Sequence, residues 1–220
     1  MRTDESPLGM KLRVRVRQHV NPLSKKYQTP ASPLDWEKIY ANLTLPLHLD
    51  IGCGRGKFLL RMAELHPDRN FLGLEIREPL VEAAHTDVKK LGLTNLHFLF
   101  CNANNSLPSI LDSFPNCSLH GVTIQFPDPW FKKRHQKRRV VQPELVNNLA
   151  TYLVSGGVVF LQSDIEEVAI QMRDRFDAHP AFRQGGEGWL ETNPLPVATE
   201  REISTLSRGE PVYRTLFIRH

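Results

Sequence analysis

The 220 residues suit one α/β domain with a full core and are too few for two domains of typical size. The formal charge of +4 is mild, and the three cysteines, Cys53, Cys101 and Cys117, match neither a metal-ligand spacing nor a disulfide framework, which favours a reducing compartment. No apolar signal region opens the chain and no apolar run reaches the roughly 18 residues of a spanning helix, so a membrane protein is excluded and a cytoplasmic one is expected.

The first thirty residues carry several prolines, many charges and no sustained apolar period. This composition predicts a basic, flexible arm over residues 1–30 that has no core face of its own, followed by one domain over residues 31–220. Basic residues gather in the arm and again in the segment 132–139. Two cationic clusters beside one domain indicate contacts with a phosphate backbone. The cluster in the arm consists of Lys11, Arg13, Arg15, Arg17, Lys25 and Lys26.

Apolar runs that alternate with helix-like patterns predict a mostly parallel sheet built from βαβ units. The expected strands cover residues 46–51, 71–75, 96–100, 119–125, 157–162 and 212–218. Helical spacing of apolar residues predicts helices over 58–63, 80–91, 141–153 and 168–176, whose apolar stripes we assign to the core. Gly92 and the pair Gly156–Gly157 are expected where helices end. The segment 183–211 is too long for a simple connector, and loops of that length usually carry function.

The sequence LHLDIGCGRGKF, residues 47 to 58, predicts a strand, a glycine turn and the start of a helix. Gly52, Gly54 and Gly56 let the backbone turn tightly and bring amides close to a ligand. Dinucleotide-binding proteins need a small residue at the sixth position of this pattern, where the chain has Lys57. An NAD-linked oxidoreductase is therefore the least favoured enzyme class.

Three polar residues at expected strand ends indicate an adenosyl cofactor. Glu75, at the end of the second strand, is placed to accept hydrogen bonds from both hydroxyls of a ribose. Asp50, just before the glycine turn, suits a cationic amino acid group, which S-adenosylmethionine has and a nicotinamide dinucleotide lacks. Asn102, after the third strand, offers a donor and an acceptor for an adenine edge, and a turn-forming asparagine is an equally good interpretation.

The segment QFPDPWFKKRHQKRR, residues 125 to 139, joins an aromatic and carboxylate turn to a dense cationic run. It follows the fourth expected strand, at the sheet edge where ligands bind in this topology. Prolines restrict Asp128 on both sides, while Phe126 and Trp130 offer flat surfaces to a base. Alone, the turn would indicate buried aromatics and the run a solvated patch. Together they favour an RNA-facing acceptor site.

The motifs GCGRGKF, GLEI, NA, QFPDPWFKKRHQKRRVV and TEREI, with RVRQHVNPLS in the arm, occur in the order and spacing of bacterial tRNA (guanine-N7)-methyltransferases. The chain resembles that family over nearly its whole length. The resemblance implies an α/β, Rossmann-like class I methyltransferase with a seven-stranded, mostly parallel sheet, helices on both faces and an antiparallel last strand. It implies methyl transfer from S-adenosylmethionine to N7 of a guanine in the tRNA variable loop, at tRNA position 46.

The resemblance also implies roles for individual residues. Asp128 is the expected catalytic residue, and no metal is expected. The family's Thr-x-x-Glu motif is present, with Glu200 and Arg201 at its two inner positions. The functional assignment therefore rests on Thr199 and Glu202. Asp164 fits a substrate contact; a helix N-cap is a modest structural alternative, and the two roles are compatible. The expected cofactor-binding residues are Asp50, Gly52, Gly54, Glu75, Asn102 and Asp128, and the expected substrate-binding residues are Lys132, Asp164, Thr199 and Glu202.

The chemistry needs no general base, because guanine N7 has an available lone pair and carries no proton. We therefore expect positioning of the two reactants to provide most of the rate. Two alternatives stay open: a methyltransferase with another RNA or non-RNA acceptor, and a non-catalytic tRNA-binding subunit. A monomer and a homodimer fit the sequence equally well.

Overall fold

Seven strands form one sheet in the computed structural model, which describes residues 20–115 and 118–220. The strands are β1 (Leu47–Ile51), β2 (Asn70–Glu75), β3 (Leu96–Phe100), β4 (Leu119–Gln125), β5 (Leu153–Ser163), β6 (Phe182–Gln184) and β7 (Tyr213–Arg219), in the order β3-β2-β1-β4-β5-β7-β6. Strands β1 to β5 pair in parallel, and β7 lies antiparallel between β5 and β6. The predicted sheet, with its antiparallel last strand, is confirmed. The arm's basic residues before position 20, and Cys117, lie outside the described residues.

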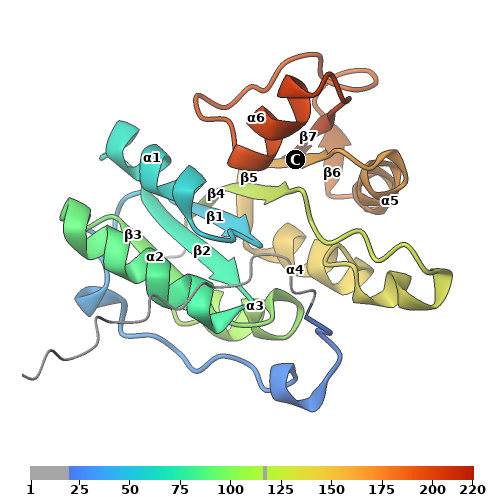
Figure 1. The fold of residues 1–220 in the computed structure, drawn as a ribbon. Coiled ribbons are helices and arrows are strands. Elements are labelled where there is room, and N and C mark those ends of the chain that lie inside the picture. Colours follow the sequence, from blue (N-terminus) through green and yellow to red (C-terminus); the bar gives the residue numbers. More distant parts are fainter. Residues whose placement is uncertain (1–19, 116–117) are drawn as a thin grey trace, which may run out of the picture.

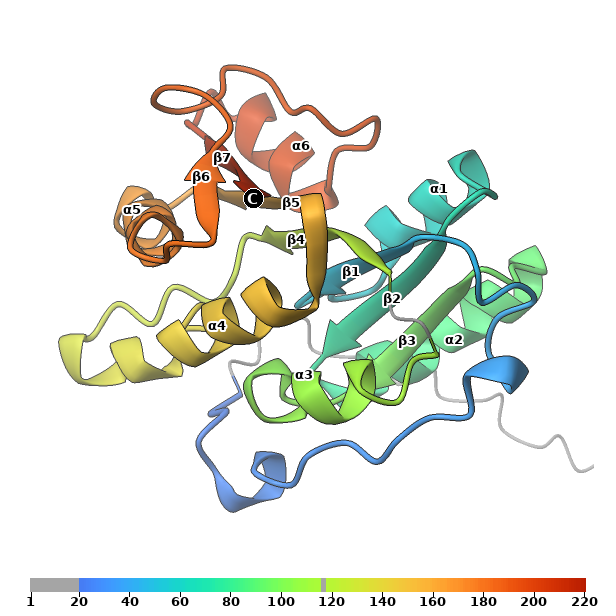
Figure 2. The same ribbon diagram turned by 180° about the vertical axis from the view of Figure 1, so that it is seen from behind.

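Helices cover both faces of the sheet, as predicted (Figures 1 and 2). One apolar cluster joins α1 (Lys57–Leu65) and α2 (Glu78–Leu91) to alternate residues of β2 and β3. The larger cluster joins α3 (Ala103–Leu111), α4 (Pro143–Tyr152) and α5 (Glu166–Asp177) to the opposite face. Both faces of the central strands are therefore buried, which is why β1 and β2 are buried along their whole length.

Several elements differ from the sequence prediction. Helix α3, strand β6 and helix α6 (Glu200–Ser207) were not predicted, and the last two lie in or beside the segment interpreted as a long loop. Gly92 ends α2 in a left-handed conformation, as expected. The pair Gly156–Gly157 does not end α4, because that helix stops at Tyr152 and the glycines lie inside β5. There Gly156 has a φ of +79°, at an irregularity in the β4–β5 pairing.

Residues 20–31, which fall largely within the predicted arm, run along α3 in both views of the ribbon. A polar stripe on that helix binds their backbone. The Asn105 side chain donates to the Tyr27 carbonyl at 2.9 Å, and the Ser106 hydroxyl accepts from the Ala31 amide at 3.0 Å. The Ser109 hydroxyl donates to the Ala31 carbonyl at 2.9 Å. This stripe explains why α3 lacked a clear apolar signature: part of its surface faces a polypeptide backbone.

The glycine turn depends on space for the Phe98 ring. A Cβ added to Gly73, in β2, would lie 2.5 Å from that ring and 2.8 Å from the Cys53 sulfur. We predict that Gly73→Ala lowers the free energy of unfolding by about 1–3 kcal/mol, because the buried ring and turn must shift. Gly186→Ala is the control, since a Cβ there meets no atom within 4 Å. Urea denaturation of both variants measures the effect, and equal stabilities would contradict the packing account.

Candidate active site

A cavity opens at the carboxyl ends of the parallel strands, the edge where ligands bind in sheets of this topology. Its lining includes Gly52 after β1, Glu75 at the end of β2, Asn102 after β3 and Asp128 after β4. It holds about 780 Å³ of empty space when its mouth, which is open to solvent, is included. Four of the residues predicted to bind a cofactor therefore share one cavity.

The glycine turn after β1 is built as the sequence predicted. Gly52, Gly54 and Gly56 have φ values of +83°, +58° and +72°, in the left-handed region that side chains disfavour. Gly56 is also the residue that precedes α1. The Gly54 amide donates to the Glu75 carboxylate at 2.8 Å, so the turn is held directly against the end of β2.

Glu75 is 3% exposed, and its carboxylate is surrounded by donors. One carboxylate oxygen accepts from the Arg77 backbone amide at 3.0 Å and from Arg77 Nε at 2.9 Å. The other oxygen accepts from the Gly54 amide and from Arg77 Nη2 at 3.1 Å. Arg77 was not singled out from the sequence, although it stands two residues after Glu75 and lines the same cavity.

Asp50 lies behind the cavity wall, 4% exposed. The Thr123 hydroxyl, on β4, donates to the Asp50 carboxylate at 2.6 Å, and that same hydroxyl lies 3.2 Å from His48 Nε2. Burial raises the pKa of Asp50 to about 7, despite the hydrogen bond from Thr123. Burial also lowers the pKa of His48 to about 4, so this imidazole is neutral near pH 7. A cation brought to this wall would favour the ionised carboxylate.

Asn102 lines the cavity, but its side chain already has partners. Its carbonyl oxygen accepts from the Asn104 amide at 3.2 Å and caps α3. Its amide nitrogen lies 3.2 Å from the Pro22 carbonyl and 3.3 Å from the Tyr27 carbonyl, and donates to both. The residue thus fastens the segment 20–31 beside the cavity, where Val20 and Pro22 form part of the lining.

The turn that carries Asp128 is held in an unusual backbone conformation. Phe126 and Trp130 have φ values of +49° and +42°, which are rare for residues other than glycine and occur often at functional sites. Asp128, between them, is exposed at the cavity. The Arg138 guanidinium carbon lies 4.9 Å from the centroid of the Trp130 ring, and both residues line the cavity.

The cationic run forms the 3-10 helix η3 (Lys133–Arg138). Lys132, the residue that precedes η3, is exposed, as are Lys133, Arg134 and Lys137. Arg139 is different, because only 3% of it is exposed. The run interpreted from the sequence as one RNA-binding surface thus contains an inward-facing member.

Thr199 and Glu202 lie together at the start of α6. The Thr199 hydroxyl caps the helix by accepting from the Glu202 amide at 3.1 Å. Glu202 is 1% exposed, and its carboxylate accepts from Arg214 on β7 at 2.8 Å and from Gln162 on β5 at 3.1 Å. Gln162 also donates to Gln125 at 2.8 Å, which connects this network to the residue before Phe126. No pattern in the sequence indicated the buried partners Gln162 and Arg214.

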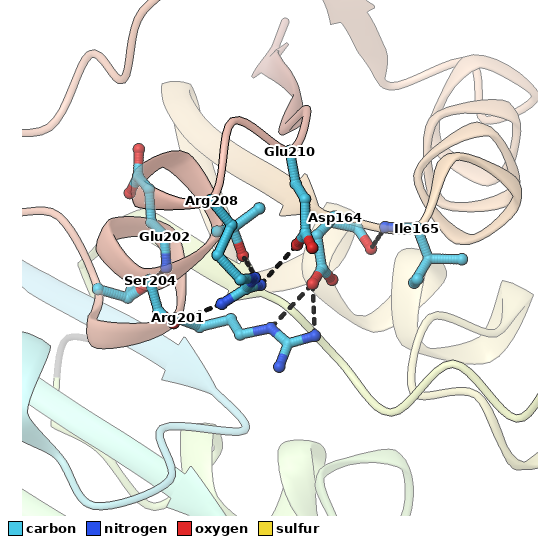
Figure 3. Close-up of polar contacts among 10 residues, drawn as sticks. Asp164, Ile165, Arg201, Glu202, Ser204, Arg208 and Glu210 are labelled. Atoms are coloured by element: carbon cyan, nitrogen blue, oxygen red, sulfur yellow. Dashed lines mark hydrogen bonds and ion pairs between the residues drawn. The ribbon is translucent and has the colours of Figure 1, made fainter.

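Asp164 sits at the edge of the same region, paired with Arg201 of α6 (Figure 3). Arg201 Nε donates to the Asp164 carboxylate at 2.8 Å. The N-cap interpretation of Asp164 is wrong: α5 begins after Ile165, which has no side-chain cap, and the Ser163 hydroxyl accepts from the Ile165 amide at 3.1 Å. Figure 3 also shows Arg208, the residue after α6, between Ser204 and Glu210. Its guanidinium donates to both, so a hydrogen bond and an ion pair hold the carboxyl end of the helix.

The described residues offer little support for other chemistries. Over 20–115 and 118–220, no cluster of three or more His, Cys, Asp or Glu residues is arranged to hold a metal ion. In the same ranges, no helix combines the length and apolar character needed to cross a membrane. Burial raises the pKa of Cys53 well above its ordinary value and that of Cys101 to about 12, so both thiols stay protonated and neither is an activated nucleophile.

Comparison with known proteins gives a consistent result. A family model described as "Putative methyltransferase" matches residues 44–215. The tRNA (guanine-N(7)-)-methyltransferase of Trichormus variabilis is 67% identical over 207 residues, which cover 94% of this chain and 96% of that protein. The protein of that name in Microcystis aeruginosa is 60% identical over 206 residues, 93% of this chain and 98% of that one.

Among solved structures, the precorrin-6y C5,15-methyltransferase of Geobacter metallireducens has a TM-score of 0.52 at 16% identity. The match covers 83% of this chain and 85% of that one, and at this identity it supports the fold alone. The fold is that of the Rossmann-like class I methyltransferases, and the resemblance seen in the sequence motifs is confirmed. The chain belongs to the tRNA (guanine-N7-)-methyltransferase family.

Proposed function

We propose that this protein transfers the methyl group of S-adenosylmethionine to N7 of a guanine in the variable loop of tRNA, at tRNA position 46. One observation carries the proposal: a cavity walled by Glu75 and backed by Asp50 also contains the Asp128 turn, which continues into exposed cationic residues. A cofactor pocket and an RNA-facing surface thus meet at one carboxylate. The names of the close relatives support the same reaction.

The residues around the cavity fit the cofactor. S-adenosylmethionine carries its methyl group on a positively charged sulfonium. Asp50, buried with a pKa near 7, would favour such a cationic ligand, and the glycine amides would approach it closely. Glu75 would hold the ribose hydroxyls, and Arg77, which engages the same carboxylate, would yield part of its contact. Asn102 would act through the segment that its side chain fastens to the cavity wall.

Asp128 would hold the guanine and stabilise its cationic product. N7 attacks with its own lone pair, so no residue has to remove a proton before the methyl group moves. Alkylation leaves a positive charge on the base, and a fixed carboxylate beside that charge stabilises it. The unusual backbone at Phe126 and Trp130 keeps this carboxylate in place, as expected where positioning supplies the rate.

The target base has to leave its stack. In A-form RNA the groove that displays N7 is deep and narrow, so a guanine in a loop is the accessible substrate. Lys132 and the exposed residues of η3 would bind the phosphates around it, with salt-dependent affinity and little sequence preference. Asp164, Thr199 and Glu202 would shape the far side of the acceptor site through α6. The proposal places the protein in the cytoplasm, where it meets its tRNA substrate. It acts there as a monomer or a homodimer.

Cofactor affinity should depend on pH through Asp50. Below its pKa of about 7 this carboxyl is protonated, and binding of the cationic cofactor must release that proton. We predict that the affinity for S-adenosylmethionine rises up to tenfold per pH unit from roughly pH 5.5 to 7 and then levels off. Titration calorimetry in buffers of different ionisation enthalpy measures both affinity and proton release. Asp50→Asn should bind weakly and without this pH dependence; a wild-type affinity that is flat with pH would contradict the assignment.

Replacing Asp128 should stop catalysis and leave RNA binding intact. We predict that Asp128→Asn lowers the turnover of 7-methylguanosine formation by about 100-fold or more, because the variant loses the charge that stabilises the cationic product. Its tRNA dissociation constant should stay within about twofold of the wild type, because phosphate contacts supply most of the affinity. Nucleoside analysis of digested tRNA and filter binding measure the two quantities. Near-normal turnover would remove Asp128 from the mechanism.

The basic arm is expected to contribute to tRNA affinity. Deletion of residues 1–19 removes Lys11, Arg13, Arg15 and Arg17 but keeps the segment 20–31 that lines the cavity. We predict weaker tRNA binding with a shallower salt dependence and an unchanged affinity for S-adenosylmethionine. Binding of both ligands across a salt series tests this. Retained tRNA affinity at every salt concentration would show that the arm has no such role.

A further inference from the structure

Arg139, the last member of the cationic run, turns its side chain into the protein. Its Nε donates to the Pro129 carbonyl at 2.7 Å, inside the turn that carries Asp128. Its two terminal nitrogens donate to α5: one to Glu167 at 2.7 Å and the other to Gln171 at 3.1 Å. Only 3% of the residue is exposed, and each of the three guanidinium nitrogens donates one of these bonds. The side chain therefore ties the acceptor turn to a helix of the core.

The backbone of Arg139 is also held. Its amide donates to the Gln136 carbonyl at 3.0 Å, and its own carbonyl accepts from the Gln142 side chain at 2.8 Å, at the residue that precedes α4. Gln136 donates in turn to Glu167 at 3.0 Å. The end of η3 is therefore fixed to α4 and α5 at once, while Lys133, a few residues earlier, is exposed.

The bond to Pro129 acts at a critical place. This carbonyl belongs to the peptide bond between Pro129, the residue after Asp128, and Trp130, which has a φ of +42°. A non-glycine residue persists in that conformation only where its surroundings enforce it. The bond from Arg139 to this turn is charge-assisted and therefore stronger than a neutral hydrogen bond. It restrains the peptide on which the direction of Asp128 depends.

We propose that Arg139 is a positioning residue for methyl transfer rather than a contact for tRNA phosphates. The inference rests on the proposed function, because it assigns Arg139 to the orientation of Asp128. The planar guanidinium reaches a carbonyl and two side chains of α5 with fixed angles, which the single ammonium of lysine does not reproduce. The hydrogen bond from Arg139 lowers the pKa of Glu167, as expected for a carboxylate that accepts from a cation. The cationic run thus has an outward half that binds RNA and an inward residue that sets the active site.

Arg139→Lys separates the two roles, because it keeps the charge and loses the geometry. We expect its turnover at saturating tRNA to fall by about 10- to 100-fold, since a small misplacement of a reacting group has an effect of that size. Its tRNA dissociation constant should stay within about twofold of the wild type, and the slope of its salt dependence should not change. Lys137→Ala is the comparison, because it removes an exposed charge from the same run. It should weaken tRNA binding and reduce the salt slope by about one.

Glu167→Gln is a second, milder variant, which tests the same role if Arg139→Lys loses activity only because it unfolds. It weakens the ion pair between α5 and Arg139 and leaves the bond from Arg139 to Pro129 in place. The Glu167 side chain is 56% exposed, so the change disturbs the core little. We expect a smaller loss of turnover, in the same direction, with an unchanged thermal unfolding midpoint and tRNA affinity. Normal turnover in both Arg139→Lys and Glu167→Gln would overturn the proposal. So would a loss of tRNA affinity and salt slope in Arg139→Lys with turnover preserved.

The wild-type protein distinguishes a failure of this inference from a failure of the proposed function. If wild type forms 7-methylguanosine and Arg139→Lys does so at the same rate, only the role of Arg139 is wrong. If wild type transfers no methyl group to tRNA, the proposed function fails, and the positioning role falls with it.

Discussion

The hydrogen bond from the Gly54 amide to the Glu75 carboxylate connects the two loops on which the cavity is built. It joins the turn after β1 to the end of β2, at the edge where all five parallel strands finish. Without this bond the buried carboxylate would lose one of its donors. With it, backbone amides and a negative charge meet at one fixed place. The adenosyl half of the site follows from this arrangement.

The acceptor half of the site is also held in place by polar contacts, here from the buried side chains of two arginines. Arg139 holds the turn of Asp128 against α5, and Arg214 on β7 holds Glu202 at the start of α6. The pair of Arg214 and Glu202 is buried on both sides, and such a pair contributes little net stability, because removing its charges from water costs about as much as their attraction returns. What the pair contributes is a fixed orientation of the two side chains, since each charged group accepts few hydrogen-bond geometries. Methyl transfer to a nitrogen that needs no general base depends on such direction.

Most of the fold could be predicted from the sequence, because the central strands are continuous apolar runs and the main helices carry apolar stripes. The missed helices had physical reasons to be missed. In α3, Asn105, Ser106 and Ser109 bind the segment 20–31 instead of packing in the core. In α6, Glu202 is buried against Gln162, which lies 40 residues away in the sequence. Gly156 and Gly157 follow a helix but belong to a strand irregularity, which short-range patterns do not distinguish.

The sequence predicted which residues line the candidate site better than it predicted which side chains contact them. Glu75 and Asp128 line the expected cavity because strand ends converge in a parallel sheet. The sequence does not show which basic residue turns inward, since Lys137 and Arg139 stand two residues apart in one cationic run and differ in what packs beside them. The partner of Glu75, Arg77, follows it closely, but only the structure shows that its guanidinium folds back.

The most direct test of the account replaces one atom of the substrate. A tRNA is prepared with 7-deazaguanosine at the target position of the variable loop, so that a carbon stands where the attacking nitrogen was. The protein should bind this tRNA as well as the unmodified one, because phosphate contacts dominate affinity. It should transfer no labelled methyl group to it, while methylating the matched guanosine tRNA. Methyl transfer to the deaza substrate at a comparable rate would contradict the assignment of N7 as the acceptor.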